Sequence, residues 1–571
     1  IRPDSFDRKE LNFFISKSEE PSYSEGTLKG TISSIPQKFG IPESSFWKTR
    51  DEDTFSGVIF APFVKGQAPQ TVAKTLQFVR DTTNTKTTAY AGGAVPGFDE
   101  KNWSRIKREN VKDFKNNKTQ LLVSTKAYGM GIDKPNIRFT LHYGIPSSIE
   151  AFYQEAGRAG RNRKDAYCGI IFTEFSEENT NAQLDPSKSI EEIKATGGER
   201  DDISNQLFFH TKTFLGVDVE VNQIKEALSK IETHFSKNQQ EVNNLFLSDK
   251  KIEIPFSMIS ANDEKIVQRL LKIGALGDYE KEYGARKYVL KINSFNLEKS
   301  KNLLKEYVGS IAPGRLLEFN KELDEINDPS PKENIILLCE SYIKFTYDFI
   351  ERSRRNAIRE MCLLARKCKD SKEIKQVIQD YLQEGASVEA LEILLQQRKV
   401  SLHDWLSRLE LVKSKLDVNE LKGQVIRLLE SYPDHPGLLF LRSTTELQSK
   451  NKDLFSINND LKFAISNSLY RYSVNISEWD PILTSAFNLL GTKSKDNLYH
   501  LVKAILELVE EGVLAENDLP ELFNLIKNLE DENISSLLAV KNISFLSNKL
   551  KKSLESIKEV FEDEKILKML E

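Results

Sequence analysis

Short apolar runs alternate with amphipathic stretches between residues 56 and 172. The apolar runs are rich in β-branched and aromatic residues, which is typical of strands: SGVIFAPF (56–63), KTTAYAGG (86–93), QLLVST (120–125), NIRFTLHYG (136–144) and YCGIIF (167–172). Between them, the spacing of apolar residues predicts helices around 69–81, 102–116 and 147–158. Because strand, helix and strand follow one another at this pace, we predict a parallel sheet with helices on its faces.

The pattern changes beyond the last of these strands. Over residues 205–295 it predicts a helix, then a short helix after residue 262 or 263, and two strands joined by a turn at Gly284. This order fits a winged helix and equally fits another small α+β module. From about residue 300 onward, Leu and Ile recur every three or four residues, which predicts helices throughout. Pairs of helices in an array would fit, although no clean repeat period is visible.

The predicted fold class is therefore an α/β domain with a parallel sheet, followed by a winged-helix-like α+β module and an all-α tail. We divide the chain into four parts. Residues 1–55 are a linker or the start of the α/β domain, and residues 56–180 are the α/β domain itself. Residues 181–298 are a connector with the winged-helix-like module, and residues 299–571 are the helical tail.

Composition excludes several classes of protein. The chain has 571 residues, of which 39% are hydrophobic and 29% charged, which suits several packed domains. No apolar stretch approaches the ~20 residues that span a bilayer, and the first residues lack an apolar signal core. Its four cysteines are scattered and form no C-x-x-C pair, so we expect no disulfide framework, no zinc site and a cytoplasmic location. The chain begins with Ile1, and we expect it to be a fragment.

The most informative chemistry lies between residues 120 and 166. A predicted strand ends at Ser124 and Thr125 and enters a loop that contains Gly129 and Gly131. Glycines let backbone N–H groups approach a phosphate closely, although most such pairs are ordinary turns.

Three polar residues follow on the next predicted helix. Gln154, Arg158 and Arg161 are spaced i, i+4 and i+7, which predicts that they share one helix face. Two arginines on one face suit the charge of a phosphoryl group in transfer, because a guanidinium matches phosphate oxygens in two places. The alternative is a solvated basic helix end.

These segments resemble a known family. The strings STKAYGMGIDKP (124–135) and FYQEAGRAGR (152–161) resemble motifs V and VI of the RecQ family of superfamily 2 DNA helicases, and SGVIFAPF resembles motif IV. The sequence departs from the family at Asn162 and Arg163, where Asp-Gly is usual, and in the Ala-Pro-Phe that follows motif IV. The resemblance implies a RecA-like fold, ATP hydrolysis, 3′→5′ translocation on DNA and unwinding of duplexes.

The resemblance also implies roles for individual residues. It makes Arg161 the arginine finger, gives Arg158 and Gln154 supporting parts in the same motif, and places Asp133 and Gly131 near the nucleotide. It further implies contacts to DNA phosphates, from Ser124, Thr125 and Gly129.

A G-x-x-x-x-G-K-[ST] phosphate loop and a D-E-x-H box are both absent from the sequence. We therefore expect ATP and Mg²⁺ to be held mainly by a first RecA-like domain that the chain lacks. The chain itself is expected to have no metal site. The fragment alone should be inactive.

A second DNA-binding surface is predicted in the winged-helix-like module. Lys265, Arg269 and Lys272 share one face of its short helix, opposite an apolar stripe, and we predict that they contact duplex phosphates. By resemblance, Tyr283 near the hairpin tip would wedge between base pairs, while the alternative is a tyrosine packed in the sheet. The cysteine zinc module of many RecQ proteins is absent.

Together these features predict the C-terminal part of an ATP-dependent RecQ-like DNA helicase, of the kind used in repair or recombination. Its partners would be single-stranded DNA and duplex junctions, with no membrane and with a protein partner for the tail. One alternative is a DNA-bound scaffold whose helical tail recruits partners, and another is a related RNA helicase, which the GMGIDKP string disfavours.

Overall fold

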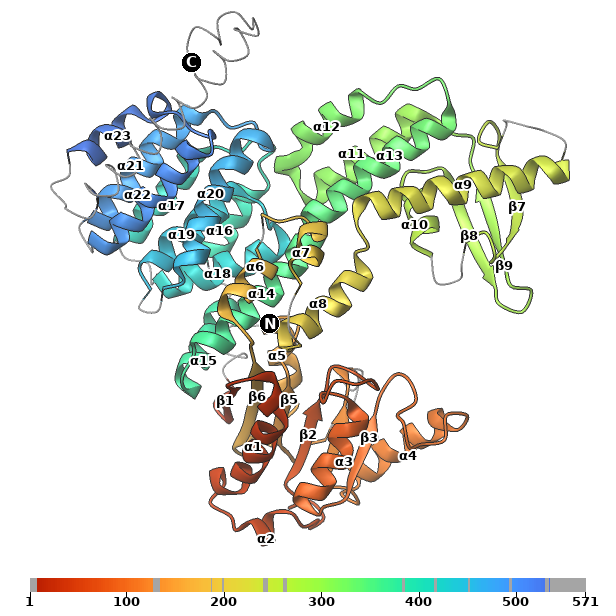
Figure 1. Ribbon diagram of the computed structural model, residues 1–571, viewed down its shortest axis with the longest axis vertical. Coiled ribbons are helices and arrows are strands. Elements are labelled where there is room, and N and C mark those ends of the chain that lie inside the picture. The colour runs from red at the N-terminus through yellow and green to blue at the C-terminus, as the bar shows by residue number, and fades with distance from the viewer. Residues whose placement is uncertain are drawn as a thin grey trace, which may run out of the picture. The chain divides into compact units, whose positions relative to one another are not determined.

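A computed structural model defines the architecture (Figure 1). It describes residues 8–126, 134–185, 187–197, 200–239, 245–259, 264–382, 386–414, 418–449, 452–491, 495–528 and 534. The chain divides into two compact units, the first of residues 1–396 and 419–434 and the second of residues 397–418 and 435–571. In the part of the chain that is described, no helix is long and apolar enough to cross a membrane.

The first unit contains a six-stranded sheet in the order β1-β6-β5-β2-β4-β3, and every pair is parallel. Its strands are β1 (Leu11–Ser18), β2 (Ser56–Phe60), β3 (Thr87–Tyr90), β4 (Leu121–Ser124), β5 (Ile137–Tyr143) and β6 (Ala166–Thr173). The predicted fold class is confirmed. The edge strand β1 was not predicted, so the sheet begins well before the boundary set at residue 56.

Helices cover both faces of this sheet, which explains why its strands are continuous apolar runs. On one face lie α1 (Ser24–Lys38), α2 (Glu43–Phe46) and α3 (Val72–Thr83). The core on the other face is formed with α5 (Ile149–Ala156) and α15 (Ser371–Leu382), and it also includes apolar residues of α8 (Asp202–Thr213) and α14 (Arg352–Lys367). The helix α4 (Trp103–Lys115) reaches both cores, because it contributes Trp103 to the first and Phe114 to the second.

The predicted tail is not separate from the sheet. The helices α14 and α15 belong to the range 299–571, yet their apolar side chains pack in the same core as β1, β5 and β6. The backbone N–H of Phe13 in β1 donates to the Ser371 hydroxyl at 2.9 Å, and Arg366 forms an ion pair with Glu174 at 2.5 Å. Part of the helical region therefore completes the α/β domain.

A second sheet lies in the middle of the chain. The elements α9 (Val217–Gln239), β7 (Lys250–Pro255), α10 (Glu264–Lys272), β8 (Leu276–Glu282) and β9 (Lys287–Ile292) form a module with antiparallel strands in the order β7-β9-β8. The predicted short helix and hairpin are confirmed. This module shares one core with three helices, α11 (Leu297–Ile311), α12 (Leu316–Asp324) and α13 (Pro331–Thr346).

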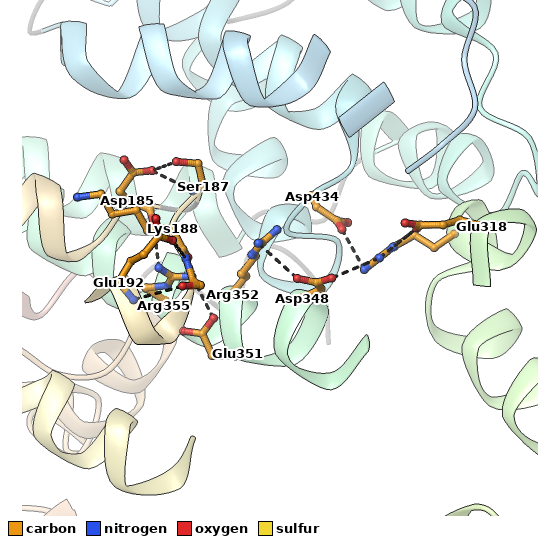
Figure 2. A network of polar contacts seen from close by, with 12 residues as sticks. Asp185, Ser187, Lys188, Glu192, Glu318, Asp348, Glu351, Arg352, Arg355 and Asp434 are labelled. Atoms are coloured by element: carbon orange, nitrogen blue, oxygen red, sulfur yellow. Dashed lines mark hydrogen bonds and ion pairs between the residues drawn. The ribbon is translucent and has the colours of Figure 1, made fainter. Parts of the chain in front are cut away.

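One long helical segment joins the two sheets of the first unit. The helix α13 continues through a π-helix, η5 (Tyr347–Glu351), into α14 without a break. Figure 2 shows the polar network around this junction: Arg355 is fully buried, lies 3.0 Å from Glu351 and donates to the backbone oxygens of Asp185 and Lys188, both at 2.8 Å. His210 of α8 contacts Glu351 at 2.7 Å. These contacts tie the long helix to the segment that follows the six-stranded sheet, which includes α6 (Glu177–Gln183) and α7 (Ile190–Thr196).

The second unit is helical over its described residues, as predicted for this part of the chain. It contains α17 (Leu402–Ser414), α19 (Pro436–Leu447), α20 (Leu454–Tyr470), α21 (Trp479–Gly491), α22 (Lys495–Glu510) and α23 (Pro520–Lys527), whereas α16 (Ala386–Leu395) and nearly all of α18 (Val418–Ser431) belong to the first unit. Every residue of α19 is buried, so it forms the centre of the second unit.

Candidate functional site

The predicted arginine helix ends earlier than its sequence pattern suggests. Ser148 caps α5 by accepting from the Ala151 N–H at 3.0 Å, and the helix ends at Ala156. Arg158 and Arg161 therefore lie beyond the helix, in a run of turns over residues 157–163 that we call the arginine turn. The prediction that they share one helix face with Gln154 is wrong. Beyond Ala156 the chain runs in turns, and at Gly160 φ is +67°, a left-handed conformation that an α-helix does not contain and that glycine adopts at little cost.

The arginine turn is fixed by a residue from the start of the chain. The Arg8 guanidinium donates to the backbone oxygens of Gly157 at 3.1 Å and Ala159 at 2.8 Å. Hydrogen bonds from a charged donor are stronger than neutral ones, and two of them on alternate carbonyls hold the turn at both sides of Arg158. This role of Arg8 was not predicted, because nothing in the local sequence pairs residue 8 with residue 157.

Glu10 completes the support. Its buried carboxylate accepts a hydrogen bond from the Arg8 guanidinium and lies 3.3 Å from the Arg163 guanidinium. Arg163 is the last residue of the arginine turn and has a left-handed backbone, with φ at 61°. Burial by itself would raise the pKa of Glu10, but the hydrogen bond from Arg8 and the two positive charges outweigh it and lower the pKa. Glu10 therefore stays ionised and keeps Arg8 in place.

The two arginines of the turn differ in exposure. The side chain of Arg158 is largely buried, whereas Arg161 is exposed. Gln154 is also exposed and donates to Glu150 one helical turn earlier at 2.8 Å. Arg161 can thus reach a phosphate that comes from outside the domain, while Arg158 is suited to hold the turn or a neighbouring group.

A buried histidine links the sheet to α5. His142 on β5 lies 2.8 Å from the Glu155 carboxylate and stacks on Phe60 at a ring distance of 4.8 Å. Glu155 lies in the last turn of α5, two residues before the arginine turn, so this pair fixes the end of α5 against the sheet. The sequence signal for this pair was a lone histidine in an apolar strand, and the pair was not predicted.

The carboxyl edge of the sheet holds the residues predicted to touch DNA. Ser124 is completely buried and its hydroxyl donates to the Thr125 carbonyl at 2.7 Å, so the predicted contact of Ser124 with a phosphate is wrong. Thr125 lies just past β4, and its backbone N–H donates to the backbone oxygen of Tyr90 at 3.3 Å. Gly129, Gly131 and Asp133 lie outside the described residues.

Lys134, three residues before β5, is held in place by its side chain. Its buried ammonium lies 2.5 Å from the Asn117 side-chain oxygen and 5.1 Å from the centre of the Phe114 ring. Burial lowers its pKa to about 8. Thr125 after β4 and Lys134 before β5 are thus each held by contacts of their own.

The basic face of α10 is only partly exposed, because Arg269 is largely buried against neighbouring helices. Arg269 lies 3.0 Å from Glu220 of α9 and 3.1 Å from Thr346 of α13, and Lys265 lies 3.8 Å from the same carboxylate. Lys272 sits 3.6 Å above the Tyr307 ring, and burial lowers its pKa. The ion pair with Glu220 holds the largely buried Arg269 inside the unit, so Arg269 acts as a structural residue and not as the predicted phosphate contact. The Lys265 side chain is 44% exposed, and the phosphate contacts of Lys265 and Lys272 stay predictions.

Tyr283 does lie at the hairpin turn, as predicted. It follows β8 directly, is 69% exposed, and its ring centre is 6.1 Å from that of Phe256. This exposure excludes the alternative of a tyrosine packed in the sheet. The wedge role stays a prediction.

Among the described residues, no group of three or more His, Cys, Asp or Glu could hold a metal ion. These residues therefore do not fit a Mg²⁺ site.

Comparison with known proteins supports a helicase-type domain. Residues 53–163 match the family model of the helicase conserved C-terminal domain. A stretch of 68 residues is 48% identical to ATP-dependent DNA helicase RecQ of Bacillus subtilis (strain 168), and 66 residues are 50% identical to a protein of Acanthamoeba polyphaga mimivirus described as ATP-dependent RNA helicase R290. Each stretch covers 12% of this chain and 12% of the relative, so only a small part of either relative is matched.

Among solved structures, the chain is similar to domain 2 of the DEAD-box helicase Mss116p bound to an RNA duplex. The identity is 15%, the alignment covers 40% of this chain and 78% of that one, and the TM-score is 0.23. The support for a superfamily 2 helicase C-terminal domain therefore comes from the sequence matches and not from this structural similarity.

Proposed function

We propose that this chain supplies the second RecA-like domain and the C-terminal region of an ATP-driven, RecQ-like DNA helicase. The observation that carries the proposal is the arginine turn, which leaves Arg161 exposed on a backbone held by Arg8. A rigid, always charged guanidinium at a domain surface is what a transferring phosphoryl group requires from a second domain.

In this proposal ATP binds between this domain and a partner domain. The partner carries the phosphate loop and holds Mg²⁺, while Arg161 stabilises the charge that develops on the γ-phosphate. Arg158 and Gln154 support the nucleotide or the contact between the domains. Asp133 and Gly131 keep the nucleotide-side roles that the family resemblance implies.

The proposed nucleic-acid path runs along the carboxyl edge of the sheet. Thr125 and the backbone at Gly129 would contact phosphates there, and Tyr283 would separate base pairs at a junction. Translocation would run 3′→5′, with DNA as the substrate because of the GMGIDKP string. DNA and RNA are distinguished by comparing how strongly each stimulates ATP hydrolysis.

A role as a passive scaffold has less support. Because α14 and α15 pack on the sheet of the α/β domain, this part of the helical region is suited to stiffen a motor. The partner of the remaining helices would be another protein.

The test is reconstitution. The 571-residue chain is assayed for ATP hydrolysis alone and after fusion to a first RecA-like domain of a RecQ-like helicase, with and without single-stranded DNA. We expect no turnover from the chain alone and DNA-stimulated turnover from the fusion. Robust turnover by the chain alone would overturn the proposal.

A further inference from the structure

Three phenylalanines form a surface cluster in the first unit. Phe208 and Phe209 are neighbours on α8 and are 45% and 41% exposed, and Phe63 lies in the loop after β2. The Phe63 ring stacks on that of Phe209 at 4.9 Å and meets that of Phe208 edge-on at 5.7 Å. We call these three residues the aromatic cluster.

The aromatic cluster is not needed for the core. The inward face of α8 is formed by Ile203, Leu207 and His210, which are spaced i, i+4 and i+7 and are all buried. Phe208 and Phe209 lie on the opposite side of the helix. Adjacent large apolar side chains that stay exposed mark interaction sites more often than single ones do.

The position of α8 places the aromatic cluster at the carboxyl edge of the sheet. Gln206 donates to the backbone oxygen of Ile145, just after β5, at 2.6 Å, and Asp202 accepts from the N–H of Thr173 at the end of β6 at 3.0 Å. Phe63 itself follows the end of β2. This is the edge at which β4 also ends, and α8 is seen beyond the strand ends in Figure 1.

A positive charge accompanies the rings. The Lys212 ammonium lies 4.0 Å from the centre of the Phe208 ring, one helical turn further along α8, and Lys212 is exposed. Aromatic faces beside a cation are the combination that binds single-stranded nucleic acid, since bases stack on the rings and phosphates meet the charge. A protein partner would need apolar area but no ring face.

We propose that the aromatic cluster is a stacking platform for the bases of single-stranded nucleic acid, with Lys212 contacting the phosphates. The inference rests on the proposed function, because it extends the strand path along the same sheet edge. It assigns a role to residues for which the family resemblance implies none, among them Phe63 of the Ala-Pro-Phe at which the sequence departs from the family.

The experiment compares two probes on the full 571-residue chain. Fluorescence anisotropy measures the affinity for a labelled oligo-dT and for an abasic strand of the same length, which keeps the phosphates and lacks the bases. We expect the natural chain to prefer oligo-dT. Phe208→Ala and Phe209→Ala should each weaken oligo-dT binding by about 5- to 150-fold, the range for loss of one stacked base, and leave the abasic strand unaffected.

Further variants separate stacking from apolar burial. Phe209→Tyr should keep the preference, whereas Phe209→Leu, which retains apolar area without a ring face, should lose it. Lys212→Ala should reduce the slope of log affinity against log salt by about 0.7, the value for one phosphate contact of a single strand. The matched control is Phe455→Ala on α20, where the side chain is 40% exposed, and it should change neither affinity.

The outcomes distinguish this inference from the function on which it rests. If the natural chain binds both probes equally, or if Leu serves as well as Phe at position 209, the platform is refuted while nucleic-acid binding stands. If neither probe binds, both proposals fall. Thermal unfolding of each variant verifies that the fold is intact, which the exposure of Phe208 and Phe209 leads us to expect.

Discussion

Replacing Arg269 by methionine tests whether the basic face of α10 is structural. Arg269 and Glu220 have side chains that are only 13% and 5% exposed, and their charged atoms lie 3.0 Å apart. Breaking a buried pair by removing one partner costs about 3–5 kcal/mol, because the other charge stays buried. Glu220 would keep the Tyr347 hydroxyl at 2.7 Å and Lys265 at 3.8 Å, so we expect a loss near the lower end, about 3 kcal/mol.

A DNA-contacting arginine would behave differently. Loss of one phosphate contact on a duplex lowers the salt slope of binding by about 0.9 and leaves stability nearly unchanged. We expect the reverse for Arg269→Met: a large loss in the free energy of unfolding, measured by urea denaturation, and an unchanged salt slope. The control is Arg108→Met, which removes an exposed arginine on α4 and should cost little stability.

A second variant verifies the cause. Adding Glu220→Leu to Arg269→Met removes the stranded carboxylate, and most of the lost stability should return because an apolar pair can replace a buried ion pair. A stable single variant with a salt slope reduced by about 0.9 would refute the reasoning and restore the DNA contact.

Three further predictions concern other sites. Arg8→Ala should slow ATP hydrolysis by the reconstituted helicase by roughly 10²-fold, the effect of about 1 Å of misplacement, while DNA affinity measured by anisotropy stays constant. Burial is the main cause that raises the pKa of Glu430 to about 7 in the folded protein. Because the folded state favours the protonated carboxyl, stability is lost as the pH rises from the pKa of the unfolded chain through 7. Glu430→Gln should therefore raise the free energy of unfolding by on the order of 3 kcal/mol at pH values above 7 and leave it nearly unchanged in acid. The thermal midpoint, measured at both pH values, should follow the same trend. Tyr283→Ala should reduce duplex unwinding without lowering single-strand ATPase activity or the thermal midpoint, since the side chain is 69% exposed; a proportional loss of all three would contradict a wedge.

The sequence predicted the sheet well because its strands are buried on both faces. Val58 and Ile59 point to opposite cores, and such continuous apolar runs between amphipathic stretches have few other interpretations. The edge strand β1 carries polar residues, so its sequence signal was weaker. The helical region was predicted correctly from its spacing, but its packing on the sheet depends on contacts between distant segments.

The errors at the candidate site have the same origin. The partner of Arg269 lies 49 residues away, and the support that Arg8 gives to Gly157 spans 149 residues. Helical periodicity identified the apolar face of α10 and could not reveal that a carboxylate pairs with Arg269 on the opposite face. At the arginine turn, extending the i, i+4 spacing across Gly157 and Gly160 ignored the tendency of glycine to end a helix.

The central claim is that Arg161 acts on ATP bound by a second domain. The direct measurement is kcat for DNA-stimulated ATP hydrolysis by the reconstituted helicase with Arg161→Ala, together with its affinity for single-stranded DNA. We predict a fall of roughly 10³-fold or more in kcat, the range for loss of an arginine finger, with DNA affinity nearly unchanged. Hydrolysis that survives while DNA binding collapses would contradict the account and would place Arg161 on the nucleic acid.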